Sequence, residues 1–249
     1  MSTRFTANTR PIPILVYHQI AAAPPKGSPF RSLYVAPEAF ARQMAWLERL
    51  GYQGLSMTAL QPYLKGQENG KVVGITFDDG YLNNLSNALP SLMKHRFSST
   101  CYAVSGLLGK TNVWDVKAGI AQTPLMNEAQ LREWVAGGQE VGSHTHQHID
   151  LTDSQPENCR FEIALGKNQL ESVVENPVAH FCYPYGRYQP EHRAMVDELG
   201  FLTATTTQRS RCHPQTDMLQ LPRVPVLRST VLPLFWLKIA TAYEDRRKK

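Results

Sequence analysis

Residues 71–84 read KVVGITFDDGYLNN, in which an apolar, β-branched run ends abruptly at two adjacent aspartates. The run at 71–77 has the composition of a short buried strand. Asp78 and Asp79 place two like charges side by side at its end, which costs stability unless a cation or a reaction requires them. Such pairs also occur at ordinary turns and helix caps. The segment therefore predicts a buried strand that ends at a candidate functional site.

On both sides of this strand, strand-like and helix-like segments alternate along the chain. We expect helices at 37–50, 82–95, 127–138, 159–174 and 190–199, and strands at 12–17, 71–77, 98–105, 139–144, 180–186 and 201–207. This alternation indicates a parallel sheet with helices outside it. If the sheet closes into a barrel, the carboxyl ends of its strands share one face, where active sites collect.

The length of 249 residues is usual for a single α/β barrel. The sequence shows no internal repeat, low-complexity segment or convincing linker. We therefore expect residues 1–249 to form one catalytic domain, with the first strand and helix, within 1–67, packing on the core.

The net charge of +5, from 26 basic and 21 acidic residues, is mild, and much of the excess lies in the tail at 246–249. No basic stripe is interleaved with aromatic residues, so a nucleic-acid partner is not expected. The apolar run at 231–237 contains Pro233 and is far shorter than the roughly 20 residues of a membrane-spanning helix. It predicts a helix packed on the body, with contact to a membrane surface as the alternative.

The amino-terminal segment has no sustained apolar stretch of the kind that a secretory signal contains. The four cysteines have no close-paired spacing, which argues against a zinc knuckle or a small disulfide framework. Both features favour a cytoplasmic location, with the inner membrane surface as a variant of it.

Two histidines follow a later predicted strand, in GSHTHQHIDL (142–151). On a helical turn, His144 and His148 would face the same way. Together with one carboxylate they would make a three-ligand set for a divalent metal, with positions left for water and substrate. The second aspartate would then be available as a base. The zinc protease pattern requires a glutamate where Thr145 stands, and iron oxygenases with a similar ligand set favour a different, all-β fold.

Three motifs, TFDDGY (76–81), GSHTHQHIDL (142–151) and YPYG (183–186), resemble in order and spacing those of the polysaccharide deacetylase family. The resemblance extends over about residues 13–226. It implies a distorted (β/α) barrel with about seven parallel strands. It also implies a metal-dependent hydrolase that removes N-acetyl groups from an amino-sugar polysaccharide, oligosaccharide or glycoconjugate.

Residue by residue, the resemblance implies that Asp79, His144 and His148 bind the metal, which in that family is usually zinc. Asp78 would be the catalytic base. The backbone N–H of Tyr185 would stabilise the oxyanion.

The chain departs from the family pattern in two places. Cys182 stands where many members have an arginine that pairs with the base, and LQLPRVPV (219–226) lacks the histidine that serves many members as the general acid. Both departures resemble the poly-N-acetylglucosamine deacetylase branch. We expect Arg223 to take the place of the missing arginine beside Asp78. His18, at the end of the first strand, would line the site, act as the acid, or be a structural histidine.

Other residues are expected to form the substrate groove. The resemblance implies that Tyr183 and Pro184, beside Tyr185, form one wall, and Trp114 would either stack on a sugar ring or pack in the core. Two other functions remain open: hydrolysis of another C–N amide bond, as in a cyclic ureide, and a silent protein that only binds metal or carbohydrate. The oligomeric state is not indicated.

Overall fold

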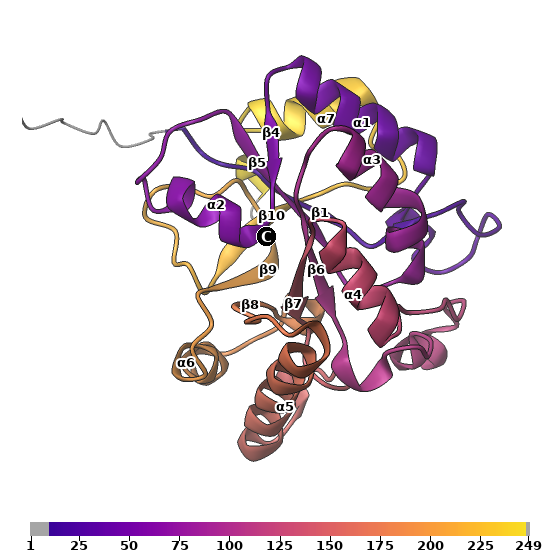
Figure 1. Ribbon diagram of the computed structural model, residues 1–249, viewed down its shortest axis with the longest axis vertical. Coiled ribbons are helices and arrows are strands. Elements are labelled where there is room, and N and C mark those ends of the chain that lie inside the picture. Colours follow the sequence, from indigo (N-terminus) through magenta and orange to yellow (C-terminus); the bar gives the residue numbers. More distant parts are fainter. Residues whose placement is uncertain (1–9, 248–249) are drawn as a thin grey trace, which may run out of the picture.

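The computed structural model describes residues 10–247. The first nine residues and the last two lysines of the basic tail, considered above, lie outside the described residues. Within residues 10–247, seven parallel strands close into a barrel, because β1 pairs with both β5 and β10 (Figure 1). Around the ring they are β1 (Ile14–Tyr17), β5 (Val72–Phe77), β6 (Thr100–Ala103), β7 (Glu140–Ser143), β8 (His180–Cys182), β9 (Thr203–Arg209) and β10 (Leu221–Pro225). The distorted barrel of about seven strands is confirmed.

The distortion is greatest around β5, which has three neighbours. The first half of β5 pairs with β4 (Gln53–Leu55), whereas its last two residues, Thr76 and Phe77, pair with β6. The short strands β2 (Gln19–Ile20) and β3 (Tyr34–Val35) form a separate pair after β1. The amino-terminal strand β1 is thus a member of the closed ring.

Helices surround the barrel (Figure 1). They are α1 (Pro37–Arg49), α2 (Met57–Leu64), α3 (Leu89–Lys94), α4 (Glu128–Ala136), α5 (Pro156–Val174), α6 (Pro190–Glu198) and α7 (Leu232–Ala240). Asn127 caps α4 in a reciprocal capping box with Gln130, as its place before the helix predicts. The helix expected at 82–95 is split, since a π-helical segment at Asn84–Ala88 precedes α3.

An aromatic cluster in the core holds the end of β5 in place. The ring of Phe77 lies 5.6 Å from that of Tyr17 and 5.7 Å from that of Trp134, measured between centroids. Phe40 of α1 completes the cluster, 5.1 Å from Tyr17. Because Phe77 directly precedes Asp78, the packing of the core fixes the position of the first aspartate.

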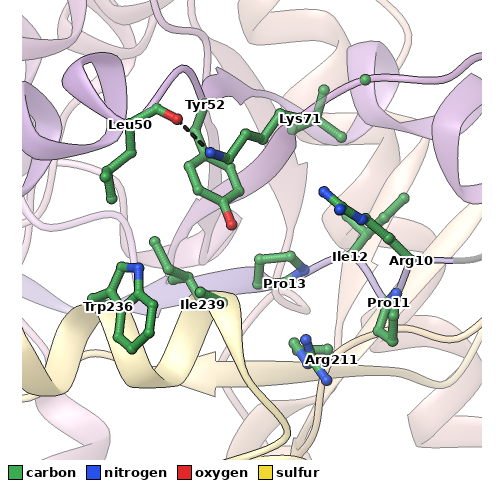
Figure 2. Close-up of a pocket in the computed structure, with 13 residues that line it drawn as sticks. Arg10, Pro11, Ile12, Pro13, Leu50, Tyr52, Lys71, Arg211, Trp236 and Ile239 are labelled. Carbon is green, nitrogen blue, oxygen red and sulfur yellow. Dashed lines mark hydrogen bonds between the residues drawn. The ribbon is translucent and has the colours of Figure 1, made fainter.

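A cavity of about 350 Å³ lies at the amino-terminal end of the strands (Figure 2). Pro13, Tyr52 and Lys71, which each directly precede a barrel strand or β4, line it together with Trp236 of α7. Its described lining contains no histidine, cysteine or carboxylate, the groups that general acid–base or metal chemistry requires. The candidate for catalysis is therefore the opposite end of the barrel.

The apolar run at 231–237 largely forms α7, whose Phe235 and Ile239 are buried against the body. Trp236 and Leu237 of the same helix are exposed. Among the described residues, no helix has the length and apolar character needed to cross a bilayer.

Candidate active site

A cavity of about 450 Å³ opens at the carboxyl-terminal end of the barrel strands. It brings together nearly all of the residues that the sequence singled out. Those lining it are His18, Asp78, Asp79, Trp114, His144, His148, Tyr183, Tyr185 and Arg223. They come from segments far apart in the chain, which the closed ring places around one opening.

Asp79 and the two histidines converge at the base of this cavity. One carboxylate oxygen of Asp79, Oδ1, lies 3.5 Å from Nε2 of His144 and 3.5 Å from Nε2 of His148. Asp79 is 6% exposed and adopts a left-handed φ of 73°, which turns the chain sharply after β5. Burial opposes ionisation of its carboxyl, but the two imidazoles outweigh this and hold the pKa of Asp79 well below its usual value.

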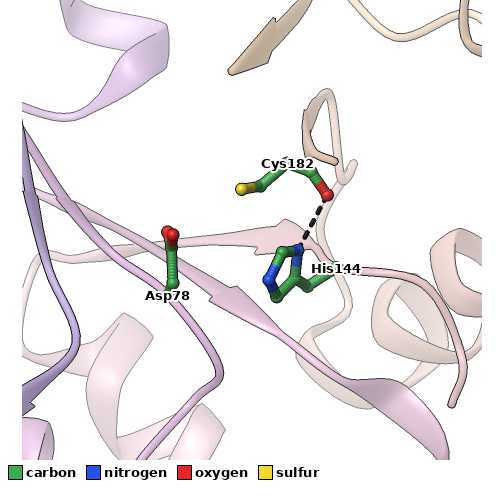
Figure 3. A group of neighbouring side chains, drawn as sticks. All are labelled: Asp78, His144 and Cys182. Atoms are coloured by element: carbon green, nitrogen blue, oxygen red, sulfur yellow. Dashed lines mark hydrogen bonds between the residues drawn. The ribbon is translucent and has the colours of Figure 1, made fainter. Parts of the chain in front are cut away.

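The orientation of His144 is set by a backbone carbonyl. Nδ1 of His144 lies 2.7 Å from the carbonyl oxygen of Cys182, which can only accept, so Nδ1 carries the hydrogen (Figure 3). In the neutral ring this leaves the lone pair on Nε2, the atom that faces Asp79. The strand end of β8 thus selects the tautomer that ligates a metal.

His148 reaches the same point along an irregular loop. The expectation that the two histidines share a helical turn is wrong, because Thr145 and His148 both have left-handed φ values, of 64° and 57°. The hydroxyl of Thr145 accepts a hydrogen bond of 3.0 Å from the backbone N–H of His148. The loop therefore turns back on itself and still presents both rings to Asp79.

Glu162, which sequence reasoning did not identify, holds this loop from α5. Its carboxylate accepts hydrogen bonds from the backbone N–H groups of His146 and Gln147, at 3.1 and 2.7 Å. Gly166, one turn further along α5, allows the approach, since a Cβ there would lie 2.9 Å from the carbonyl carbon of Thr145. The ring of His146 bonds Ser105 through Nδ1 and is not part of the cluster around Asp79.

Asp78 is locked by a buried arginine. Nη1 and Nη2 of Arg223 donate to the two carboxylate oxygens of Asp78 at 2.6 and 2.7 Å, and Arg223 is only 1% exposed. Burial alone would raise the pKa of Asp78, but the charge and hydrogen bonds of Arg223 lower it below the usual value. The structure thus places Arg223 against Asp78, at the buried wall of the cavity.

Cys182 lies beside the Arg223–Asp78 pair. Nη2 of Arg223 lies 3.2 Å from the sulfur of Cys182, and the thiol points toward Asp78 (Figure 3). A side chain as small as cysteine leaves room for the guanidinium group that arrives from β10. His18 also approaches Asp78, with its Nε2 3.9 Å from Oδ2 and its side chain 25% exposed.

Aromatic rings enclose the histidine cluster. Trp114 stacks on His148 with centroids 4.3 Å apart, and Tyr185 meets the same imidazole edge-on at 4.7 Å. Trp114 thus lines the cavity and also packs against a candidate ligand. Its neighbour Asp115 is half-buried and accepts from the Asn112 amide at 2.8 Å, and burial raises the pKa of this carboxyl.

The residues of the YPYG turn differ in their exposure to the cavity. Tyr185 is 45% exposed and has a left-handed φ of 58°, whereas the phenol of Tyr183 is buried and donates to the Leu219 carbonyl. Pro184 is buried in the turn and is not among the residues lining the cavity, so the structure does not place it where substrate would bind, in contrast to the expectation. Gly186 is required, because a Cβ there would lie 1.9 Å from the hydroxyl of Thr207.

Comparison with known proteins agrees with this geometry. Residues 65–204, more than half of the chain, match the family model described as polysaccharide deacetylase. The chain belongs to the polysaccharide deacetylase family. This deacetylase is 29% identical over 217 residues to the protein YxkH of Bacillus subtilis, covering 86% of this chain and 71% of YxkH.

Two further comparisons concern proteins with a described activity. The deacetylase is 25% identical over 205 residues to the poly-β-1,6-N-acetyl-D-glucosamine N-deacetylase of Staphylococcus epidermidis, covering 77% of this chain and 68% of that protein. Its fold matches the Streptococcus pyogenes deacetylase PplD, solved in complex with acetate, with a TM-score of 0.82 and 25% identity over 93% of this chain and 99% of PplD. The protein is thus a metal-dependent de-N-acetylase, a hydrolase of C–N bonds other than peptide bonds.

The cluster around Asp79 fits the divalent metal that such deacetylases use. Donor atoms of Asp79, His144 and His148 lie within 4.8 Å of one another, and all three residues are buried. The nitrogen–oxygen separations of 3.5 Å are long for hydrogen bonds. Two ligands bound to one tetrahedral ion, with bonds of about 2.0–2.2 Å, would lie roughly 3.4 Å apart. The spacing therefore suits ligands that share an ion.

Proposed function

We propose that the protein removes acetyl groups from N-acetylated amino sugars in a polysaccharide, oligosaccharide or glycoconjugate, with Asp78 as the base and Asp79, His144 and His148 as the metal ligands. The observation that carries this proposal is that the two adjacent aspartates have different partners. Asp79 faces two imidazoles at 3.5 Å, whereas Asp78 is bound by Arg223 at 2.6 and 2.7 Å. The relative from Staphylococcus epidermidis, which acts on poly-β-1,6-N-acetylglucosamine, supports the substrate class.

The ion proposed is zinc. Two imidazole nitrogens and one carboxylate oxygen form a donor set that suits zinc, and three protein ligands leave a coordination position open. A zinc ion bound there supplies Lewis-acid polarisation of the acetyl carbonyl and a water molecule acidic enough to react near neutral pH.

The protein side chains then divide the proton transfers between them. Asp78, kept ionised by Arg223, accepts a proton from the attacking water as the new C–O bond forms. The backbone N–H of Tyr185 donates to the negative oxygen that develops on the acetyl carbon. His18, beside Asp78 at 3.9 Å, donates a proton to the amine as the C–N bond breaks. Acetate and the free amino sugar are released.

Acetate release tests this assignment. Zinc-loaded protein is mixed with N-acetylglucosamine oligomers, and acetate is measured for the wild type, Asp78→Asn and His18→Ala. Asp78→Asn is expected to lose about 10²–10⁴-fold in turnover while zinc remains bound. Unchanged turnover in His18→Ala would remove the acid role of that residue. No acetate from the zinc-bound wild type would favour a different amide substrate, such as a cyclic ureide, or a silent site.

We also propose that the chain acts as one catalytic domain in the cytoplasm, at the inner membrane surface. In support of one domain, β1 completes the same ring as β10. In support of the location, the four cysteines are free and buried, and α7 exposes Trp236 and Leu237. Co-sedimentation with phosphatidylglycerol vesicles that is lost in Trp236→Ser is expected. Equal recovery in the supernatant with and without vesicles would refute the membrane contact.

A further inference from the structure

Phe30 is an exposed aromatic residue at the active-site cavity that the mechanism does not use. Its side chain is 57% exposed, yet it lines the same cavity as Asp78 and Asp79. It lies between β2 and β3, in the loop that follows β1. An exposed phenylalanine leaves apolar surface in water, so its place beside a catalytic centre calls for a partner that covers it.

The backbone at Phe30 adopts a conformation that bulky residues avoid. Its φ is 51°, in the left-handed region. Such strain persists only when surrounding contacts enforce it, and it concentrates at ligand-binding sites. Two hydrogen bonds hold the residues that directly follow Phe30. Arg31 Nε donates to the Pro24 carbonyl at 2.6 Å, and the backbone N–H of Arg228 donates to the Ser32 carbonyl at 2.8 Å.

The order of the strands places Phe30 across the opening from Tyr185. Its loop follows β1, whereas Tyr185 follows β8, which is three strands away around one side of the ring and four around the other. Asp79, after β5, and His144, after β7, belong to strands that lie between them on the longer side. Phe30 and the pair Tyr185 and Trp114, whose rings both contact His148, therefore line different parts of the same cavity.

We infer that Phe30 forms a second sugar subsite, which binds the pyranose ring next to the one that loses its acetyl group. This inference rests on the proposed function. The apolar C–H face of a pyranose covers an aromatic ring without leaving the sugar hydroxyls unsatisfied, and aromatic residues supply such contact area at low entropic cost. Leu33 and Leu227, which also line the cavity, extend the apolar surface around Phe30. The enzyme thus recognises a chain of sugars rather than a single N-acetylated residue.

Chain-length dependence of the kinetics tests the inference. Zinc-loaded wild type, Phe30→Ala and Phe30→Trp are assayed for acetate release from N-acetylglucosamine and its di-, tri- and tetrasaccharides. Phe161→Ala is the matched control, because Phe161 on α5 is 58% exposed and is not among the residues lining the cavity. We expect kcat/KM of the wild type to rise about tenfold from monosaccharide to disaccharide.

In Phe30→Ala most of this rise should vanish through a higher KM for the longer substrates, with a much smaller effect on the monosaccharide. Phe30→Trp should keep the rise, and Phe161→Ala should match the wild type. The inference is wrong if Phe30→Ala lowers kcat/KM by one common factor at every length, or has no effect.

A binding measurement separates this inference from the proposed function. Titration of the di- and monosaccharide into zinc-loaded Asp78→Asn, with and without Phe30→Ala, reports affinity without turnover. Tighter binding of the disaccharide that depends on Phe30 supports the subsite even if the wild type releases no acetate. Equal affinity for both lengths contradicts the subsite while leaving a measured deacetylase activity intact.

Discussion

Arg223 is the main partner of the buried charge on Asp78. Arg223 contributes both of the short hydrogen bonds to its carboxylate and is itself held by the Thr206 carbonyl, at 2.9 Å from Nε. Removing one member of such a pair leaves an uncompensated charge in the interior, and this strongly lowers the free energy of unfolding. Arg223 is thus required both for stability and for the position of the base.

Replacement of this arginine should therefore affect stability and turnover together. We predict that Arg223→Met lowers the free energy of unfolding by about 3–5 kcal/mol. The melting temperature would fall by roughly 10 °C for a chain of this size. Turnover should fall as well, because Asp78 loses the group that orients it. Arg228→Met, an exposed neighbour on the following loop, is the control. Equal melting curves for the two variants, measured by circular dichroism, would contradict the prediction.

Gly186 permits the turn that presents the backbone N–H of Tyr185. Its φ is 70°, and an added Cβ would meet both the side chain and the backbone of Thr207, at 1.9 and 2.6 Å. We predict that Gly186→Ala displaces Tyr185 and lowers kcat by about 10²-fold, the usual effect of losing one oxyanion donor. Zinc content, measured by atomic absorption, should be unchanged. A variant with wild-type kcat would show that the N–H of Tyr185 is not the donor.

At the scale of elements, α5 holds the loop that carries the proposed metal ligands His144 and His148. Glu162 is 5% exposed and satisfies two backbone N–H groups of the loop that carries His144 and His148. We predict that Glu162→Ala weakens zinc binding by about 10–100-fold, because supporting groups of this kind orient the ligands. Competition with a fluorescent zinc chelator measures the change. Glu157→Ala, exposed on the same helix, should bind zinc as the wild type does. Matching affinities in both variants would refute this role of Glu162.

The sequence predicted the barrel and most of the elements because periodicity and strand-end polarity are local signals. It also located Asp78, Asp79 and the two histidines, which lie in short motifs. Glu162 was missed because the sequence around an acidic residue on a helix does not indicate which distant N–H groups will donate hydrogen bonds to it. The left-handed φ values of Thr145 and His148 were missed because neither is a glycine or an asparagine, and tertiary contacts impose them. The left-handed φ of Phe30 was missed for the same reason, because phenylalanine rarely adopts it.

At the scale of the whole molecule, a partly buried polar cluster joins the starts of four successive barrel strands. Oε1 of Glu140 on β7 lies 3.5 Å from Nε2 of His180 on β8. Nδ1 of His180 lies 2.7 Å from the hydroxyl of Thr203 on β9. Hydroxyls of Thr100 on β6 and Thr58 on α2 donate to the same carboxylate. Burial by itself would raise the pKa of Glu140, but these hydrogen bonds and the nearby imidazole lower it.

This cluster predicts a specific loss of stability in acid. Because the pKa of Glu140 is lower in the folded chain than in the unfolded one, its contribution is complete above the unfolded value, about 4.3. The contribution is lost as the pH falls through the depressed folded value. Urea unfolding should show Glu140→Gln less stable by about 2 kcal/mol at pH 7, with the difference shrinking below pH of about 4. A difference that is constant over this range would mean that ionisation of Glu140 plays no part.

The ring closes only when β10 pairs with β1, and this has a consequence for biosynthesis. Arg223 lies 145 positions after Asp78, so the base emerges from the ribosome on the order of ten seconds before its partner. During that interval Asp78 lacks the arginine that compensates its charge in the closed barrel. We therefore expect hydrolytic competence only after β10 has emerged and paired with β1, and we expect a chain that stops before β10 to release no acetate. The same strand that closes the barrel thus also brings Arg223 to Asp78.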